Sequence, residues 1–147
     1  MRINLIVVGK LKEKFLVDGV AEYLKRLKKF ASVEVREISE CRTLEEEGQK
    51  LLSLVPQNSW LCVLDVAGTP LTSEEFAKKI AALTLDGVSN LTFVIGGAFG
   101  LSEELRRAAS FRLSLSKMTL THQMARLFLV EQIYRAFKIN RHEPYHW

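Results

Sequence analysis

A glycine-rich segment, Gly96-Gly97-Ala98-Phe99-Gly100, is the part of the sequence best suited to hold a ligand. It lies between an apolar run, Leu91 to Ile95, and a helical pattern that begins at Ser102. Glycines at such a place let the backbone approach a ligand closely and point its N–H groups at it. A tight turn that needs positive φ angles is the simpler interpretation. Three glycines in five residues favour a ligand-binding loop.

The spacing of these glycines disfavours the common nucleotide-binding loops. The order G-G-x-x-G comes late in the chain and differs from the dinucleotide fingerprint. No carboxylate follows about 20 residues later to bind a ribose, because residues 111–124 contain no Asp or Glu. Gly-Lys-Ser/Thr is also absent, so the segment is not a triphosphate-binding loop. A nicotinamide-dependent oxidoreductase is therefore a poor match.

Acid–base chemistry is open to three histidines near the C-terminus, His122, His142 and His146. The last two are four residues apart, a metal-like spacing on a helix, but Pro144 between them argues against a helix. No cysteine or third nearby ligand completes such a site, so we expect no metal. The chain also has no G-x-S-x-G nucleophile motif.

The elements that must position these residues alternate between strand and helix along the chain. Apolar runs and period-2 alternation predict the strands, and helical spacing predicts the helices, two of them with capping-box patterns. We expect strands at 3–8, 32–38, 60–65, 91–95 and 111–115, and helices at 15–30, 43–54, 72–83, 102–109 and 122–138. This order predicts an α/β fold, a mostly parallel sheet sandwiched by helices, in one domain of residues 1–147.

Ligands of such sheets bind beyond the carboxyl ends of the strands. Three loops qualify here, 65–70, 96–100 and 116–121. Asp65 is the one carboxylate at the end of a predicted strand. We favour a role for it as the cap of the turn at Ala67 and Gly68.

The last predicted helix is apolar around most of its circumference, which indicates burial in the core or in a homodimer interface. Glu131 and Arg135 are four residues apart and can pair, or Arg135 can bind a phosphate. Tyr145, His146 and Trp147 could stack on bases, although an exposed tail ordinarily frays.

Charge is distributed unevenly along the 147 residues. The net charge is +4, and from Leu105 onward only two carboxylates oppose eight lysines and arginines. A basic C-terminal third suits an anionic partner, nucleic acid first, and a lightly basic solvated surface is the plainer alternative. No apolar run approaches the roughly 20 residues that span a bilayer. With no signal-peptide pattern and two distant cysteines, we expect a cytoplasmic protein without membrane association.

Several motifs together match a known family. They are Ile95-Gly96-Gly97-x-x-Gly100, Leu113-Ser114-Leu115-Ser116-Lys117-Met118-Thr119, His122-Gln123, Glu131-Gln132-Ile133-Tyr134-Arg135-Ala136 and Pro144-Tyr145-His146. The chain resembles, over essentially its whole length, the bacterial large-subunit rRNA methyltransferase H family of the SPOUT class. The sequence departs from the family pattern at Thr121, His142 and Trp147.

The resemblance implies a fold, a donor and a substrate. It implies a SPOUT-type α/β knot with a C-terminal trefoil knot, a homodimer, and S-adenosylmethionine as methyl donor. The implied reaction methylates N3 of a pseudouridine in 23S rRNA on the assembled ribosome. The alternative that we keep is a non-catalytic rRNA-binding or ribosome-assembly module.

The resemblance also assigns roles to residues. The implied contacts of the donor are Leu64, Gly96, Gly97, Gly100, Leu115, Ser116, Lys117, Met118, Thr119 and Leu120. The implied catalytic residues are Arg135, His122, Tyr145 and His146, which would position the target or accept its proton. Arg135 and the tail would reach the target across the dimer. We further expect Gly96→Val to abolish donor binding and leave the fold intact.

Overall fold

The computed structural model describes residues 1–147 and contains one five-stranded sheet. The strands lie in the order β2-β1-β4-β3-β5, and all four pairings are parallel. The strands are β1 Arg2–Val8, β2 Ser32–Ile38, β3 Trp60–Pro70, β4 Asn90–Ile95 and β5 Phe111–Ser114. The helices are α1 Lys14–Leu27, α2 Leu44–Ser53, α3 Ser73–Leu85, α4 Glu103–Ala108 and α5 His122–Asn140. The predicted α/β fold with a parallel sheet is confirmed, and the trefoil knot stays a prediction.

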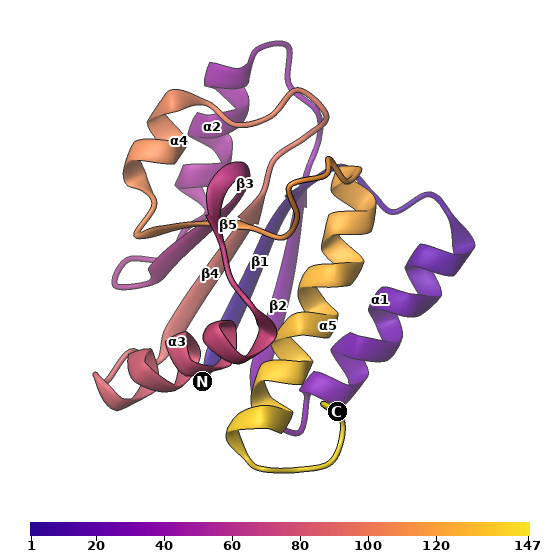
Figure 1. Ribbon diagram of the computed structural model, residues 1–147. Coiled ribbons are helices and arrows are strands. Elements are labelled where there is room, and N and C mark those ends of the chain that lie inside the picture. The colour runs from indigo at the N-terminus through magenta and orange to yellow at the C-terminus, as the bar shows by residue number, and fades with distance from the viewer.

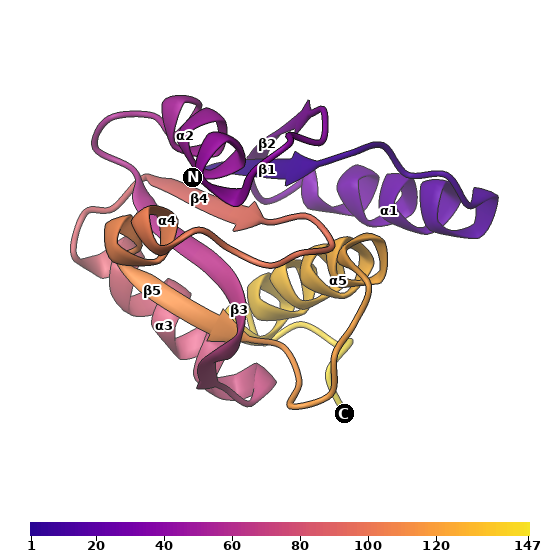
Figure 2. The ribbon, with the colours of Figure 1, turned by 90° about the horizontal axis from the view of Figure 1, so that it is seen from above.

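Helices cover both faces of the sheet. Helices α1, α3 and α5 lie on one face and α2 and α4 on the other (Figures 1 and 2). The alternation of side chains along β1 serves both layers, because Ile3, Leu5 and Val7 pack with the larger core cluster while Ile6 and Val8 pack with the smaller one. Burial on both faces explains why the central strands are continuously apolar.

Side-chain caps begin most of the helices where the sequence predicts them. Thr72 and Glu75 form the expected capping box at α3. At α2 the Thr43 side chain accepts a hydrogen bond from the Glu46 N–H, which is half of the predicted box. Ser102 and Thr121 cap α4 and α5 in the same way. These caps place both helix starts directly after the loops at the carboxyl edge of the sheet.

Strand β3 is longer than the predicted 60–65. It continues to Pro70, with a register shift between Leu64 and Thr69 in its pairing to β5. A Cβ atom at Gly68 would lie 2.7 Å from the carbonyl oxygen of Arg112, so only glycine allows the strand to pass this close to β5. The predicted turn is therefore wrong; it is an irregular stretch within a strand that resumes pairing.

Helix α5 is enclosed by the rest of the chain. Of its 19 residues only Phe128 is exposed, at 42%. It packs on β4 and between α1 and α3, which accounts for its apolar circumference. The two cysteines are both free, and no helix is long and apolar enough to cross a membrane.

Candidate active site

The carboxyl ends of β4, β3 and β5 adjoin, because these strands are neighbours in the sheet. Leu64, half-buried near the middle of β3, is paired in register with Leu113 of β5. The segment 96–100 leaves β4 beside it, and the loop 115–121 leaves β5 on the other side. The structure thus brings the ten residues implied to contact the donor to one edge of the sheet.

The glycine segment is held by its own backbone and by α2. Gly97 and Gly100 form an isolated bridge, and the Gly97 N–H donates to Glu47 Oε1 at 3.1 Å. A Cβ atom at Gly96 would lie 2.7 Å from the Gly100 carbonyl oxygen and 2.8 Å from Leu101 Cδ2. Gly96 is therefore required by the loop itself. The expectation that Gly96→Val leaves the fold intact is wrong, because the new side chain would meet protein atoms.

The loop 115–120 leaves its main chain unpaired. None of the backbone–backbone hydrogen bonds outside the helices and strands involves these six residues. Two side-chain bonds shape the loop: the Met118 N–H donates to Ser116 Oγ, and the Ser114 hydroxyl donates to the Ser116 carbonyl, both at 3.0 Å. Most N–H and C=O groups of this loop are free to bond a ligand or water.

A cavity of about 340 Å³ lies beside this loop. The end of β5, the start of α3 and the outer side of α5 line it, with apolar side chains and hydroxyl groups. Its walls include Leu115, Ser116, Leu120 and Phe128. Its volume is at the lower end of the roughly 300–1,000 Å³ typical of small-molecule sites. The glycine segment is not part of its lining, so the cavity covers one side of the candidate site.

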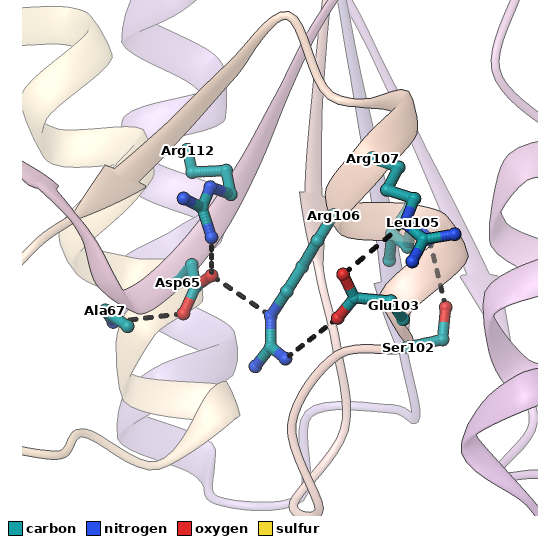
Figure 3. Close-up of polar contacts among 8 residues, drawn as sticks. All are labelled: Asp65, Ala67, Ser102, Glu103, Leu105, Arg106, Arg107 and Arg112. Carbon is teal, nitrogen blue, oxygen red and sulfur yellow. Dashed lines mark hydrogen bonds and ion pairs between the residues drawn. The ribbon is translucent and has the colours of Figure 1, made fainter.

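Asp65 binds both the backbone of the irregular stretch of β3 and two arginines. Its Oδ1 accepts from the Ala67 N–H at 3.0 Å, as predicted, and Oδ2 accepts from Arg106 Nε at 3.2 Å and Arg112 Nη1 at 3.5 Å (Figure 3). The carboxylate is buried, with a side chain 5% exposed. It joins β3, α4 and β5 directly after Leu64 and so fixes the irregular part of β3. The sequence shows no sign of these two arginine contacts.

The C-terminal tail turns back around the end of α5 (Figure 1) and is held in place by side-chain contacts. The Tyr145 hydroxyl donates to Glu131 Oε1 at 2.8 Å and lies 3.0 Å from the Tyr23 hydroxyl. Its ring packs edge-on against Tyr134 and lies under the Arg135 guanidinium. The expectation that the tail frays is wrong for this segment, whereas Trp147 is 96% exposed.

Arg135 and His146 form a second part of the tail contact. Arg135 pairs with Glu131, as the spacing predicts, and its Nη1 donates to His146 Nδ1 at 3.0 Å. His146 Nε2 lies 2.7 Å from Glu74 Oε1 of α3. With Nδ1 accepting from a guanidinium, the proton of the neutral imidazole is on Nε2, where it is donated to the carboxylate. Tyr23 and Glu74 could not be found from sequence, because they are 122 and 72 residues from their partners.

The candidate catalytic residues are in two places. His122 begins α5, directly after the loop 115–120, with Nε2 close to Gly9 at the end of β1. Arg135 lies about 20 Å farther along the helix axis, together with Tyr145 and His146. Within one chain His122 lies at the edge of the sheet that carries the implied donor contacts, whereas His146 contacts Glu74, next to Thr72 and Ser73 of the cavity beside the loop 115–120.

Several basic residues of the C-terminal third are already paired within the chain. Arg126 is 2% exposed, and it donates to Glu37 Oε2 at 2.7 Å and to the Gly9 carbonyl at 2.9 Å. Its Nε has no partner. Because Arg126 is buried and Arg106 and Arg112 hold Asp65, these three are not a free basic surface, contrary to the simplest interpretation of the charge distribution. No group of three or more His, Cys, Asp or Glu side chains is placed to hold a metal ion.

Comparison with known proteins identifies the family. The family model described as "Predicted SPOUT methyltransferase" matches residues 1–146, nearly the whole chain. The chain belongs to the SPOUT methyltransferase family. It is 49% identical to ribosomal RNA large subunit methyltransferase H of Halothermothrix orenii and 44% identical to that of Enterococcus faecalis, in each case over 99% of both chains. The resemblance stated from the motifs is confirmed.

A solved structure supports the fold of this SPOUT methyltransferase. It is described as a probable methylase family protein from Haemophilus influenzae Rd KW20, with a TM-score of 0.54 and 13% identity. The match covers 95% of this chain and 66% of the other. At this identity the likeness bears on the fold alone. It agrees with the parallel α/β sheet described above.

Proposed function

We propose that this SPOUT methyltransferase transfers the methyl group of S-adenosylmethionine to N3 of a pseudouridine in 23S rRNA, on the assembled ribosome and in the cytoplasm. The observation that carries the proposal is full-length identity of 44–49% to proteins named ribosomal RNA large subunit methyltransferase H. Residues 1–147 would act as one domain.

The donor fits the carboxyl edge of the sheet. The free main-chain groups of the loop 115–120 suit the hydrogen-bonding edge of an adenine, and Leu64, Leu115 and Leu120 offer apolar walls. Gly96, Gly97 and Gly100 form a compact segment without side chains, with open space beside Gly100. We assign the donor contacts to these residues and to Ser116, Lys117, Met118 and Thr119.

The chemistry asks mainly for placement and for loss of one proton. The bound donor supplies a methyl group already activated on a sulfonium. The N3 lone pair forms the new N–C bond, the C–S electrons remain on sulfur, and the N3 proton leaves. The protein's work is to hold N3 in line with the methyl carbon and to accept that proton.

The structure separates the candidates for these two tasks. Burial, followed by hydrogen bonding with Tyr23 and Glu131, raises the pKa of the Tyr145 phenol above its usual value, so the phenol keeps its proton near neutral pH. Both nitrogens of His146 are engaged by Arg135 and Glu74. We therefore assign Arg135, Tyr145 and His146 to positioning, and His122, at the donor edge, to accepting the proton.

The resemblance to the rRNA methyltransferase H family is the basis for a homodimer. Arg135 and the tail of one subunit would then reach a target held at the donor edge of the other, through a contact between the two subunits. The exposed ring of Phe128, midway along α5, offers apolar surface for such a contact. We propose that each site joins the donor edge of one subunit with the tail of its partner.

Methyl transfer to purified ribosomes tests the reaction. Ribosomes from cells lacking the gene would be incubated with labelled S-adenosylmethionine beside free 23S rRNA and separate subunits. Label on assembled ribosomes, mapped to N3 of a pseudouridine, is the expected result. Donor binding without transfer to any acceptor would contradict the substrate, and absence of donor binding would favour the non-catalytic module.

Mixed dimers test the shared site. One subunit would carry Leu120→Arg, to block the donor edge, and the other Arg135→Ala. If sites are shared, the mixed dimer contains one site with both defects and one with neither, so activity returns although each pure variant is inactive. A mixed dimer as inactive as its parents would place each whole site within one chain.

A further inference from the structure

A second cavity, of about 350 Å³, lies between α1 and α5 at the ends where both helices finish. The two helices run side by side there (Figure 1). The donor edge of the sheet is at the opposite end of α5, so this cavity is distinct from the site described above. No role in donor binding or in the reaction accounts for it.

The cavity has an excess of positive charge. Five cationic side chains and two carboxylates line it: Lys25, Arg26, Lys29, Lys138 and Arg141 against Glu22 and Glu143. Glu22 pairs with Arg26 at 3.1 Å, and Glu143 pairs with Lys138 at 2.8 Å and Arg141 at 3.6 Å. Lys25 and Lys29 have no carboxylate within 4.0 Å.

Helix ends alone do not require this much charge. A cation near a C-terminus interacts favourably with the helix dipole, but the effect is confined to the last turn and needs one or two charges. Lys29 lies beyond the end of α1, and Arg141 is the C-cap of α5. The charges therefore converge on the cavity from the C-terminal ends of both helices. The two lysines that lack a carboxylate partner, Lys25 and Lys29, would be stabilised by a bound anion.

Two aromatic rings, those of Phe30 and Tyr134, also line the cavity and indicate which part of an anion would bind. Arg141 lies 5.0 Å from the centre of the Phe30 ring, Arg26 lies 5.6 Å from that of Tyr134, and Lys138 is 5.8 Å from both. These cations cover the ring faces and are held in place by them. A base could stack only by displacing them, so the cavity suits a phosphate group rather than a base.

We propose that this cavity binds a phosphodiester group of the RNA backbone, with Lys25 and Lys29 as its free contacts. The inference rests on the proposed rRNA substrate. Lys138 is three residues after Arg135 and is thus its neighbour on α5. An RNA strand positioned by Arg135 and the tail would therefore pass the cavity, which anchors it away from the reacting base.

The test uses paired substitutions of equal charge change. Lys25→Gln/Lys29→Gln removes the two free contacts, and Arg42→Gln/Lys50→Gln removes two exposed charges near α2, on the other face of the sheet. For each protein, ribosome binding is measured against salt concentration, together with donor affinity, kcat and KM. The slope of log K against log salt should fall by about 1–2 for the first pair. KM for ribosomes should rise with kcat and donor affinity unchanged, and the second pair should behave as wild type.

Each other outcome overturns the inference in a distinct way. If both pairs of substitutions change the salt slope and KM equally, the cavity contributes only as general surface charge. If the salt slope falls on ribosomes but not on protein-free 23S rRNA, the cavity binds an acidic ribosomal protein instead of RNA. A change of oligomeric state in sedimentation would assign it to a contact between subunits. A last outcome separates this inference from the proposed reaction. If the variant shows the expected loss of slope on RNA but the wild-type protein transfers no methyl group, the proposed reaction fails and this inference stands.

Discussion

The Cα of Gly96 lies so close to Gly100 that an added Cβ would be 2.7 Å from the Gly100 carbonyl oxygen. This contact closes the glycine segment on itself at the edge of the sheet where we place the donor. The shape of that edge therefore depends on a backbone contact within the loop, and the donor is not needed to explain why glycine stands at position 96.

Substitution of Gly96 should accordingly damage stability and binding together. Gly96→Ala would force the loop apart, and we expect a loss of about 1–3 kcal/mol in unfolding free energy and at least about tenfold weaker donor binding. Urea unfolding and calorimetry measure the two. Ala98→Val adds bulk to an exposed position of the same segment and should leave both unchanged. If Gly96→Ala weakens donor binding and leaves the unfolding free energy unchanged, position 96 contacts only the ligand and the loop does not require glycine.

Asp65 should support Leu64 through its arginine contacts. Asp65→Ala removes hydrogen bonds to Ala67, Arg106 and Arg112, and we expect a cost of about 2 kcal/mol because bonds to charged groups are worth about 1.5–3 kcal/mol. The half-exposed arginines recover solvation, which limits the loss. Glu103→Ala, at a side chain 65% exposed, serves as the control and should cost less than about 0.5 kcal/mol. Equal costs would show that the Asp65 network contributes nothing beyond surface pairing.

Arg135→Ala should lower turnover on ribosomes and leave donor affinity unchanged. The side chain is not part of the lining of the cavity beside the donor loop, and its loss frees His146 and Tyr145 from their present geometry. Misplacement of the target by such a change can cost on the order of 10²-fold in rate. Arg135→Lys keeps the charge but not the fork that reaches both Glu131 and His146, so partial rescue is expected. Parallel losses of turnover and donor affinity would contradict the assignment.

The structure also shows which features the sequence could not reveal. Strands, helices and caps follow from local patterns, and β1, α3 and α5 begin or end within about two residues of the expected positions. The continuation of β3 to Pro70 depends on pairing with β5, more than 40 residues later. The burial of Arg126 depends on Glu37, 89 residues earlier, and the ordered tail depends on Tyr23 and Glu74. These missed contacts are long-range, and no local pattern encodes them.

Cys62 should be inert in the folded protein. Burial raises the pKa of its thiol from 9.0 to about 12, so almost no reactive thiolate exists near pH 8. The folded state then holds this proton more tightly than the unfolded chain does. Its contribution to stability is complete below about pH 9 and is lost as pH rises toward 12. A thiol reagent should modify one group quickly, the half-buried Cys41, and Cys62 only on unfolding. Fast modification in Cys41→Ser would contradict this.

His142 occupies a position that suits glycine. Its φ is +55°, and the end of α5 has the hydrogen bonds of a Schellman motif, from the His142 N–H to the Ile139 carbonyl and from the Glu143 N–H to the Lys138 carbonyl. A side chain in this left-handed region costs about 1–2 kcal/mol, and the greater freedom of unfolded glycine returns part of it.

His142→Gly should therefore stabilise the protein by about 0.5–1 kcal/mol, measured by urea unfolding. Arg141→Gly, at a cap with φ −94°, gains no such relief and should destabilise it. Because the motif also aims the chain toward Tyr145 and His146, the stabilised variant should keep its activity on ribosomes. A stabilised variant that loses activity would show that the His142 side chain itself takes part in positioning the target.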